Sequence, residues 1–251
     1  MNIFWLNGAF LPEEDALISP EDSGFTTGIG VFDSQLAVDG KLVYGEEHFA
    51  RLMHDSEIVI QKKPDTDINA FIRTAEKLLQ KNNLVAGRAR VRSTITGGIP
   101  EHILGPAQKL TVLMCVGPAP DTGTLPPVKA CIIADYPCIA GCALENCKRL
   151  DYTRSYAARR MAEKQGAQEA ILTNTDGNIA CGATSNIFIE ENGTLITPPL
   201  SDGVLAGVTR RKIIEERGAR EESISVERLK KADKTFLTNS LTGLREISKI
   251  I

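Results

Sequence analysis

Residues 24–52 read GFTTGIGVFDSQLAVDGKLVYGEEHFARL, and three successive patterns in this stretch decide the fold of the first half of the chain. Glycines at positions 24, 28 and 30 predict tight backbone turns and therefore a loop. The pair Asp39-Gly40 separates two apolar-rich runs, 32–38 and 41–44, which is the strongest short-range signal of a β-hairpin. From residue 46 onward apolar residues recur at spacings of three and four, so a helix is predicted over 46–60.

The same two periodicities alternate along the rest of the chain. Apolar stripes at helical spacing predict helices over 67–79, 152–164 and 208–217. Short apolar or alternating runs predict strands over 3–6, 88–96, 109–116, 128–134, 169–173, 186–190, 194–197, 234–237 and 246–251. Turns are expected at Asp176-Gly177 and Asn192-Gly193. Runs of strands with helices among them, and little βαβ alternation, predict an α+β fold.

A segment rich in proline and glycine divides the chain. Residues 117–127 read GPAPDTGTLPP, which sustains neither a helix nor a strand ladder. The segments on either side are each long enough to bury a core of their own. We therefore expect a smaller α+β N-terminal domain over 1–118, a linker over 119–127 and a larger C-terminal domain over 128–251.

Composition excludes several classes of protein. The chain has 251 residues, 42% of them apolar and 24% charged, which is typical of a folded globular protein. Its 29 basic and 32 acidic residues leave a net charge of −3 without a basic block, so nucleic acid and membrane surfaces are not expected partners. The first ten residues lack the features of a signal peptide, and no window reaches the roughly 18 apolar residues of a spanning helix. We expect a cytoplasmic protein.

The six cysteines indicate neither a disulfide scaffold nor a metal centre. A chain of this length builds a core without disulfide bonds, so reduced thiols are expected. Cys138, Cys142 and Cys147 are spaced by four and five, with no Cys-x-x-Cys and no nearby histidine. That spacing is unlike the ligand pattern of zinc sites, and we expect no metal.

Three features could carry chemistry, and each also has an ordinary structural interpretation. Lys148 lies just before a predicted helix, where most lysines are solvated. Val208 and Thr209 open another helix, whose first N–H groups could bind a phosphate or could be an ordinary helix start. Arg51 could lie at the surface or point inward as an anion clamp. A phosphate cup and a lysine are compatible with pyridoxal phosphate but do not establish it.

Six blocks of sequence, in order, resemble one family of enzymes. They are DSGFTTGIGVF at 22–32, HFARL at 48–52, Lys148 with Tyr152 four residues on, GATSNIF at 182–188, LAGVTR at 205–210 and TNSLTG at 238–243. Together they resemble the class IV pyridoxal-phosphate enzymes, which comprise branched-chain aminotransferases, D-amino acid aminotransferases and 4-amino-4-deoxychorismate lyases. The resemblance covers nearly the whole chain. It implies a two-domain α+β fold with the cofactor in the cleft between the domains, and a homodimer.

The resemblance also implies roles for individual residues. Lys148, expected in the C-terminal domain, would form the Schiff base with pyridoxal phosphate and carry the proton at the substrate α carbon. Arg51 would bind the cofactor phosphate. The other residues implied at the phosphate are Val208, Thr209, Asn239 and Ser240. The residues implied to contact the substrate are Ser34, Arg92 and Thr96.

Two positions depart from the family pattern. Relatives have a glutamate five residues before the asparagine of the NIF block, where it pairs with the pyridine nitrogen; here that position is Cys181. A neutral thiol supplies no charge there, so the cofactor should withdraw electrons less strongly. Relatives also place an arginine for the substrate carboxylate where this chain has Gly97, so Arg92 would substitute and His102 could assist.

These departures favour one activity over another. Weak electron withdrawal should hinder full transamination more than an elimination whose product becomes aromatic. We therefore expect a 4-amino-4-deoxychorismate lyase of folate biosynthesis, which releases pyruvate and 4-aminobenzoate. The TNSLTG block favours the same activity, although Arg245-Glu246-Ile247 after it departs from the lyase pattern. The alternatives are an aminotransferase acting on branched-chain or D-amino acids, and a catalytically degenerate member that acts as a binding protein.

Overall fold

The hairpin that Asp39-Gly40 predicts is present between strands β3 (Gly30–Val38) and β4 (Lys41–Leu42). The computed structural model describes residues 2–251. Asp39 and Gly40 both adopt positive φ angles, 47° and 77°, as the two-residue hairpin turn of type I′ requires. The hairpin belongs to the first of two units into which the chain divides, and this unit comprises the chain up to Asp121 together with Cys147–Asp151.

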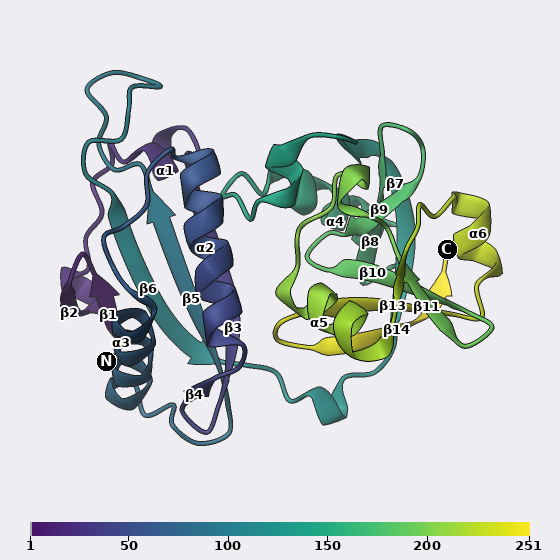
Figure 1. The fold of residues 1–251 in the computed structure, drawn as a ribbon, viewed down its shortest axis with the longest axis horizontal. Coiled ribbons are helices and arrows are strands. Elements are labelled where there is room, and N and C mark those ends of the chain that lie inside the picture. Colours follow the sequence, from purple (N-terminus) through teal and green to yellow (C-terminus); the bar gives the residue numbers. More distant parts are fainter. Residues whose placement is uncertain (1) are drawn as a thin grey trace. The chain divides into compact units, whose positions relative to one another are not determined.

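The first unit is an antiparallel sheet covered by helices (Figure 1). Its strand order is β2-β1-β6-β5-β3-β4. The strands not yet introduced are β1 (Ile3–Leu6), β2 (Ala9–Pro12), β5 (Arg88–Thr96) and β6 (Thr111–Pro118), and the helices are α1 (Ser23–Thr26), α2 (Gly45–Val59) and α3 (Ile68–Lys81). Leu52 of α2 and Leu78 of α3 join Val31 and Val91 of the sheet in one core. Amphipathic helices on an apolar sheet face therefore account for this unit.

The second unit contains a mixed sheet of eight strands, in the order β12-β11-β10-β13-β14-β7-β8-β9. The strands are β7 (Val128–Cys138), β8 (Glu169–Asn174), β9 (Ile179–Gly182), β10 (Asn186–Glu191), β11 (Thr194–Thr197), β12 (Arg220–Glu221), β13 (Lys234–Asn239) and β14 (Gly243–Ile250). The helices are α4 (Thr153–Lys164), α5 (Val208–Arg217) and α6 (Val226–Lys231). Neighbouring residues of β8 alternate between two cores, Ile171 in one and Leu172 in the other. Both faces of this strand are buried, which explains its nearly continuous apolar run.

The chain passes from the first unit to the second after Asp121 and returns to the first unit at Cys147–Asp151. Leu150 donates its N–H to the carbonyl of Gly30 at 3.0 Å, and Arg149 forms a β-bridge with Val31. Lys148 therefore belongs with β3 in the first unit, which differs from the expectation that the domain over 128–251 carries it. Backbone pairing between segments more than a hundred residues apart leaves no local pattern in the sequence.

Other differences are local. The stretch expected to be a loop at 24–30 contains the short helix α1, which begins because Asp22 Oδ1 accepts the N–H of Gly24 at 2.8 Å. Strands β9 and β12 and helix α6 were not predicted from the sequence. No helix among residues 2–251 has the length and apolar character needed to span a bilayer.

Candidate active site

Lys148 is fixed to the first unit through both of its backbone polar groups. Its N–H donates to Asp55 Oδ2 at 2.8 Å, and its carbonyl accepts the N–H of Phe32 at 2.9 Å. The Nζ atom lies 4.5 Å from the centroid of the Phe32 ring, a distance at which an ammonium group is attracted to an aromatic face. The half-buried lysine is therefore not the freely solvated residue that its position before a helix would suggest.

The structure brings Arg92 to the same aromatic ring. Arg92 of β5 stands opposite Ser34 of β3, and its Cζ atom lies 3.7 Å from the centroid of the Phe32 ring. Because side chains alternate along a strand and opposed residues share a face, Phe32, Ser34 and Arg92 lie on one face of this sheet. Two cationic side chains, Arg92 and Lys148, thus contact one ring.

Thr96, the third residue expected at the substrate, forms its hydrogen bonds in another part of the unit. Its hydroxyl donates to Asp22 Oδ2 at 2.8 Å and accepts the N–H of Gly98 at 3.2 Å. Only 6% of the residue is exposed. Thr96 therefore stabilises the turn around α1. Neither hydrogen bond of its hydroxyl involves Lys148.

Arg51 points inward and is oriented by Asp33. Its Nε and Nη2 atoms lie 3.0 and 2.6 Å from Asp33 Oδ2, while His48 Nδ1 lies 2.7 Å from Asp33 Oδ1. Burial alone would raise the pKa of Asp33, but the charges and hydrogen bonds of Arg51 and His48 outweigh it and lower that pKa to about 2. The guanidinium is thus held in one orientation by the carboxylate of Asp33.

Asp33 and His48 were not expected at this site, although the sequence carries a signal for each. Asp33 is the charged residue of a strand whose other members are mostly buried. His48 precedes Arg51 by three residues, so both lie on one face of α2. A charged residue in a buried strand and a matching pair on a helix indicate a buried ion cluster only once the two elements are known to pack together.

Cys181 lies in β9 beside a second thiol. Its Sγ atom is 3.9 Å from Sγ of Cys138 at the end of β7. The hydrogen bond with Cys138 and burial raise the pKa of Cys181 well above its usual range. The same hydrogen bond, with the nearby guanidinium of Arg154, lowers the pKa of Cys138. Cys181 is therefore a neutral thiol near pH 7, as expected from the sequence.

The N-terminus of α5 presents backbone N–H groups of the kind that bind anions. The helix begins after Gly207, and no side chain among the described residues caps it, so the first-turn N–H groups of Val208 and Thr209 lack intrahelical acceptors. A Cβ atom at position 207 would clash with Asn186 Oδ1, and Asn186 Nδ2 donates to the carbonyl of Leu205 at 2.9 Å. The asparagine of the NIF block thus shapes the loop that leads into the helix. This cradle fits a phosphate group.

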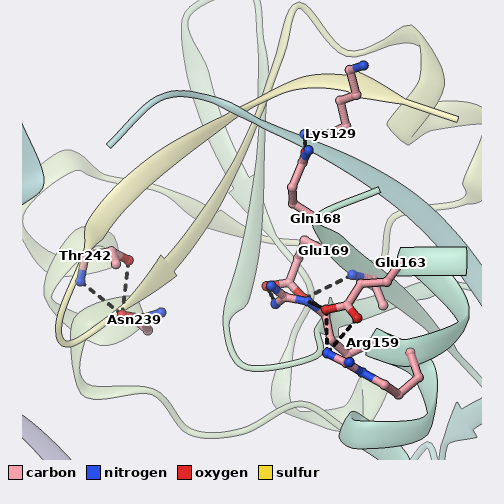
Figure 2. A network of polar contacts seen from close by, with 9 residues as sticks. Lys129, Arg159, Glu163, Gln168, Glu169, Asn239 and Thr242 are labelled. Carbon is pink, nitrogen blue, oxygen red and sulfur yellow. Dashed lines mark hydrogen bonds and ion pairs between the residues drawn. The ribbon is translucent and has the colours of Figure 1, made fainter. Parts of the chain in front are cut away.

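Asn239 shapes the loop that carries Ser240. Its Oδ1 atom accepts hydrogen bonds from the N–H and the hydroxyl of Thr242 (Figure 2) and from the N–H of Leu241, all at 3.0 Å. The side-chain oxygen of Asn239 is therefore used within the turn. The groups of this pair that could donate to a phosphate are the Nδ2 of Asn239 and the hydroxyl of the partly buried Ser240.

Asn239 and Thr242 also line a hollow of about 150 Å³ together with Arg159 and Glu169. Arg159 forms ion pairs with Glu163 and Glu169 (Figure 2), with distances of 3.3 Å from Nε to Glu163 Oε1 and 3.3 Å from Nη1 to Glu169 Oε2. These carboxylates compensate the charge of the guanidinium. The start of α5 is therefore the better candidate for a phosphate, since the described residues place neither an acidic side chain in its first turn nor a side-chain cap on it.

Comparison with known proteins agrees with this arrangement. Residues 30–250 match the family described as amino-transferase class IV. The chain is 30% identical over 273 residues to the D-alanine aminotransferase of Staphylococcus epidermidis, covering 100% of this chain and 89% of that protein. It is 29% identical over 255 residues to the aminodeoxychorismate lyase of Bacillus subtilis, covering 99% and 86%.

A solved structure shows the same fold. The branched-chain aminotransferase of Thermoproteus uzoniensis superposes with a TM-score of 0.91 at 24% identity, covering 99% of this chain and 87% of that one. The chain therefore belongs to the class IV aminotransferase family, and the predicted α+β fold is confirmed. Members of this family are pyridoxal-phosphate-dependent enzymes, and this chain is an enzyme of that kind.

Proposed function

We propose that this enzyme is a 4-amino-4-deoxychorismate lyase, which releases pyruvate and 4-aminobenzoate from a single substrate. The observation that carries the proposal is the neutral thiol of Cys181, whose pKa is raised by Cys138 and by burial. Pyridoxal phosphate, when bound, supplies an electron-accepting ring, and a neutral partner at the ring nitrogen weakens that acceptance. An elimination that forms an aromatic product depends less on electron acceptance by the ring than a full transamination does. The likeness to the Bacillus subtilis lyase supports the same choice.

The residues of this chain would hold the cofactor at three points. Lys148 would bind its aldehyde, and Cys181 would face its ring nitrogen. Arg51, oriented by Asp33, would bind the phosphate. The further phosphate contacts would be the N–H groups of Val208 and Thr209 and the hydroxyls of Thr209 and Ser240.

Lys148 and Arg92 would act on the substrate. The Nζ atom of Lys148 would move the proton at the substrate α carbon, taking it from that carbon and giving it to the product. Arg92 would bind a substrate carboxylate from the face of the sheet that it shares with Ser34. The Phe32 ring, in contact with both cations, would hold the two groups at one place.

An aminotransferase is the second candidate. The chain matches a D-alanine aminotransferase over its whole length, at an identity as high as its match to the lyase. The two activities differ in what they require. A lyase forms pyruvate from aminodeoxychorismate without a keto-acid acceptor, whereas an aminotransferase needs both an amino donor and an acceptor.

The test is a pyruvate assay on the purified protein reconstituted with pyridoxal phosphate. We expect pyruvate and 4-aminobenzoate in equal amounts from aminodeoxychorismate alone. The variant Lys148→Ala should lose turnover and should no longer attach the cofactor on borohydride reduction. If the protein is active only when an acceptor keto acid is added, it is an aminotransferase and the lyase proposal is wrong. Attachment at a different lysine would overturn the assignment of Lys148, and no attachment at all would favour a binding protein.

We also propose that two copies of the chain associate through the first unit. Apolar side chains are exposed there at Phe25, Ile103 and Leu104, by 78%, 75% and 77%. Ile103 and Leu104 border a pocket of about 660 Å³. Exposed apolar groups of this size beside a hollow are typical of an interface, and a second copy of the chain is the occupant that the family resemblance implies.

A further inference from the structure

Asp55 is a buried carboxylate that none of the roles above uses. It lies in α2, and only 3% of its side chain is exposed. Burying an ionised carboxylate is unfavourable unless hydrogen bonds compensate it. The structure gives Asp55 two partners: the N–H of Lys148, at 2.8 Å from Oδ2, and Nδ1 of His54, at 3.2 Å from Oδ1. The first of these links Asp55 to a residue 93 positions away in the chain.

The bond to Asp55 differs in kind from the other bonds that hold this segment. The carbonyl of Lys148 and the N–H of Leu150 pair with the backbone of β3, and any sequence could make those bonds. The N–H of Lys148 instead meets a side chain, so this contact depends on the residue at position 55. Together, Asp55 and Phe32 fix the peptide groups on both sides of the Lys148 Cα atom.

Helix α2 brings two functions together on one face. Arg51 and Asp55 are four residues apart, one turn along the helix. Arg51 is the proposed phosphate ligand, and Asp55 holds the backbone of the proposed cofactor lysine. A single rigid helix would therefore set the distance between the phosphate and the amine.

We propose that Asp55 is a positioning residue for Lys148, accepting its peptide N–H and so aiming its side chain at the reacting atoms. This inference rests on the proposed role of Lys148. The backbone at Lys148 sets the direction of its Cα–Cβ bond. Because the side chain beyond that bond is long and flexible, this direction decides which region its Nζ atom can reach. A shift of about 1 Å at that point is enough to lower turnover substantially, by up to a hundredfold.

The first test measures the hydrogen bond itself, in the full chain without cofactor. Amide hydrogen exchange of Lys148, read at single-residue resolution by NMR, should be faster by roughly tenfold to a hundredfold in Asp55→Ala. In Asp55→Asn the amide oxygen can still accept the bond, so exchange should stay within about threefold of the parent protein. The matched control is His54→Gln, which removes the other partner of Asp55 and should leave exchange at Lys148 unchanged. Unchanged exchange in a folded Asp55→Ala protein would overturn the proposal.

The second test connects the bond to chemistry in the cofactor-loaded enzyme. We expect kcat to fall about tenfold or more in Asp55→Ala with a smaller change in KM, and to recover in Asp55→Asn. Equal losses in both variants, or an unchanged kcat in Asp55→Ala, would overturn the positioning role. If instead the proposed role of Lys148 is wrong, the variant Lys148→Ala keeps the bound cofactor and its turnover. That result does not depend on the residue at position 55, so the two failures can be told apart.

Discussion

Asp33 is the residue whose ionisation most affects the fold of the first unit. Its pKa of about 2 in the folded chain lies below the ordinary value of 3.8, because Arg51 and His48 surround it. The resulting stabilisation, about 2 kcal/mol, is fully present above about pH 4 and is lost as the pH falls toward 2. Removing the carboxylate would also remove the hydrogen-bond partner that the buried Arg51 and His48 side chains share.

We therefore expect Asp33→Asn to lower the free energy of unfolding by about 3 kcal/mol at pH 6, with a smaller difference from the parent protein at pH 3. Denaturant titrations at the two pH values measure it. Glu76→Gln is a suitable control, since its partner Lys41 is 77% exposed and such pairs contribute less than about 1 kcal/mol. A difference that does not change between pH 6 and pH 3 would contradict the role assigned to Asp33.

Cys181 is the residue that decides between two activities in our proposal. Cys181→Glu would place a carboxylate where the thiol is now neutral, and Arg154 nearby would favour its charged form. We expect the rate of amino-group transfer from alanine, followed by absorbance, to rise at least tenfold, and pyruvate release from aminodeoxychorismate to change less. Cys181→Ser controls for size and keeps the position neutral. If neither rate responds to the glutamate, this position does not set the balance between the reactions.

At the scale of elements, the start of α5 makes a separate prediction. A methyl group at position 207 would collide with Asn186 and displace the loop that aligns the first-turn N–H groups. Gly207→Ala should therefore weaken binding of pyridoxal phosphate about tenfold, as measured by fluorescence titration. Gly117→Ala is the matched control, because its added carbon would meet only Arg90 Nη2, at 3.5 Å. Equal affinities in the two variants would show that this helix start does not hold the phosphate.

Elements differ in how well local sequence predicts them. The hairpin at Asp39-Gly40 and helices α2, α3, α4 and α5 follow from turn chemistry and helical periodicity, and their predictions are confirmed. Short elements such as α1 and β9 escape prediction because four residues contain only about one period of the helical pattern or two of the strand pattern. Tertiary contacts stabilise them instead: Asp22, which caps α1, is held in place by the hydroxyls of Thr96 and Thr111.

At the scale of the whole molecule, the proposed association of two copies has a direct test. Replacing Ile103 and Leu104 with glutamate would place charges in the apolar interface. We expect sedimentation velocity to show a dimer for the parent chain and a monomer for this double variant. Val85→Glu, at an apolar position that is 46% exposed outside the Phe25, Ile103 and Leu104 surface, should remain a dimer. A parent chain that sediments as a monomer would refute the proposal.

The linear sequence by itself determined the α+β class, most helices and strands, and, through six ordered blocks, the family. It also pointed to Lys148, Arg51 and Cys181, because catalytic blocks are local patterns. Only the tertiary structure decided which groups these residues meet: Asp33 for Arg51, Cys138 for Cys181, and Asp55 with β3 for Lys148. The physical reason is that hydrogen bonds and ion pairs between distant segments depend on how sheets and helices pack, and packing distances are not encoded in any short stretch of residues.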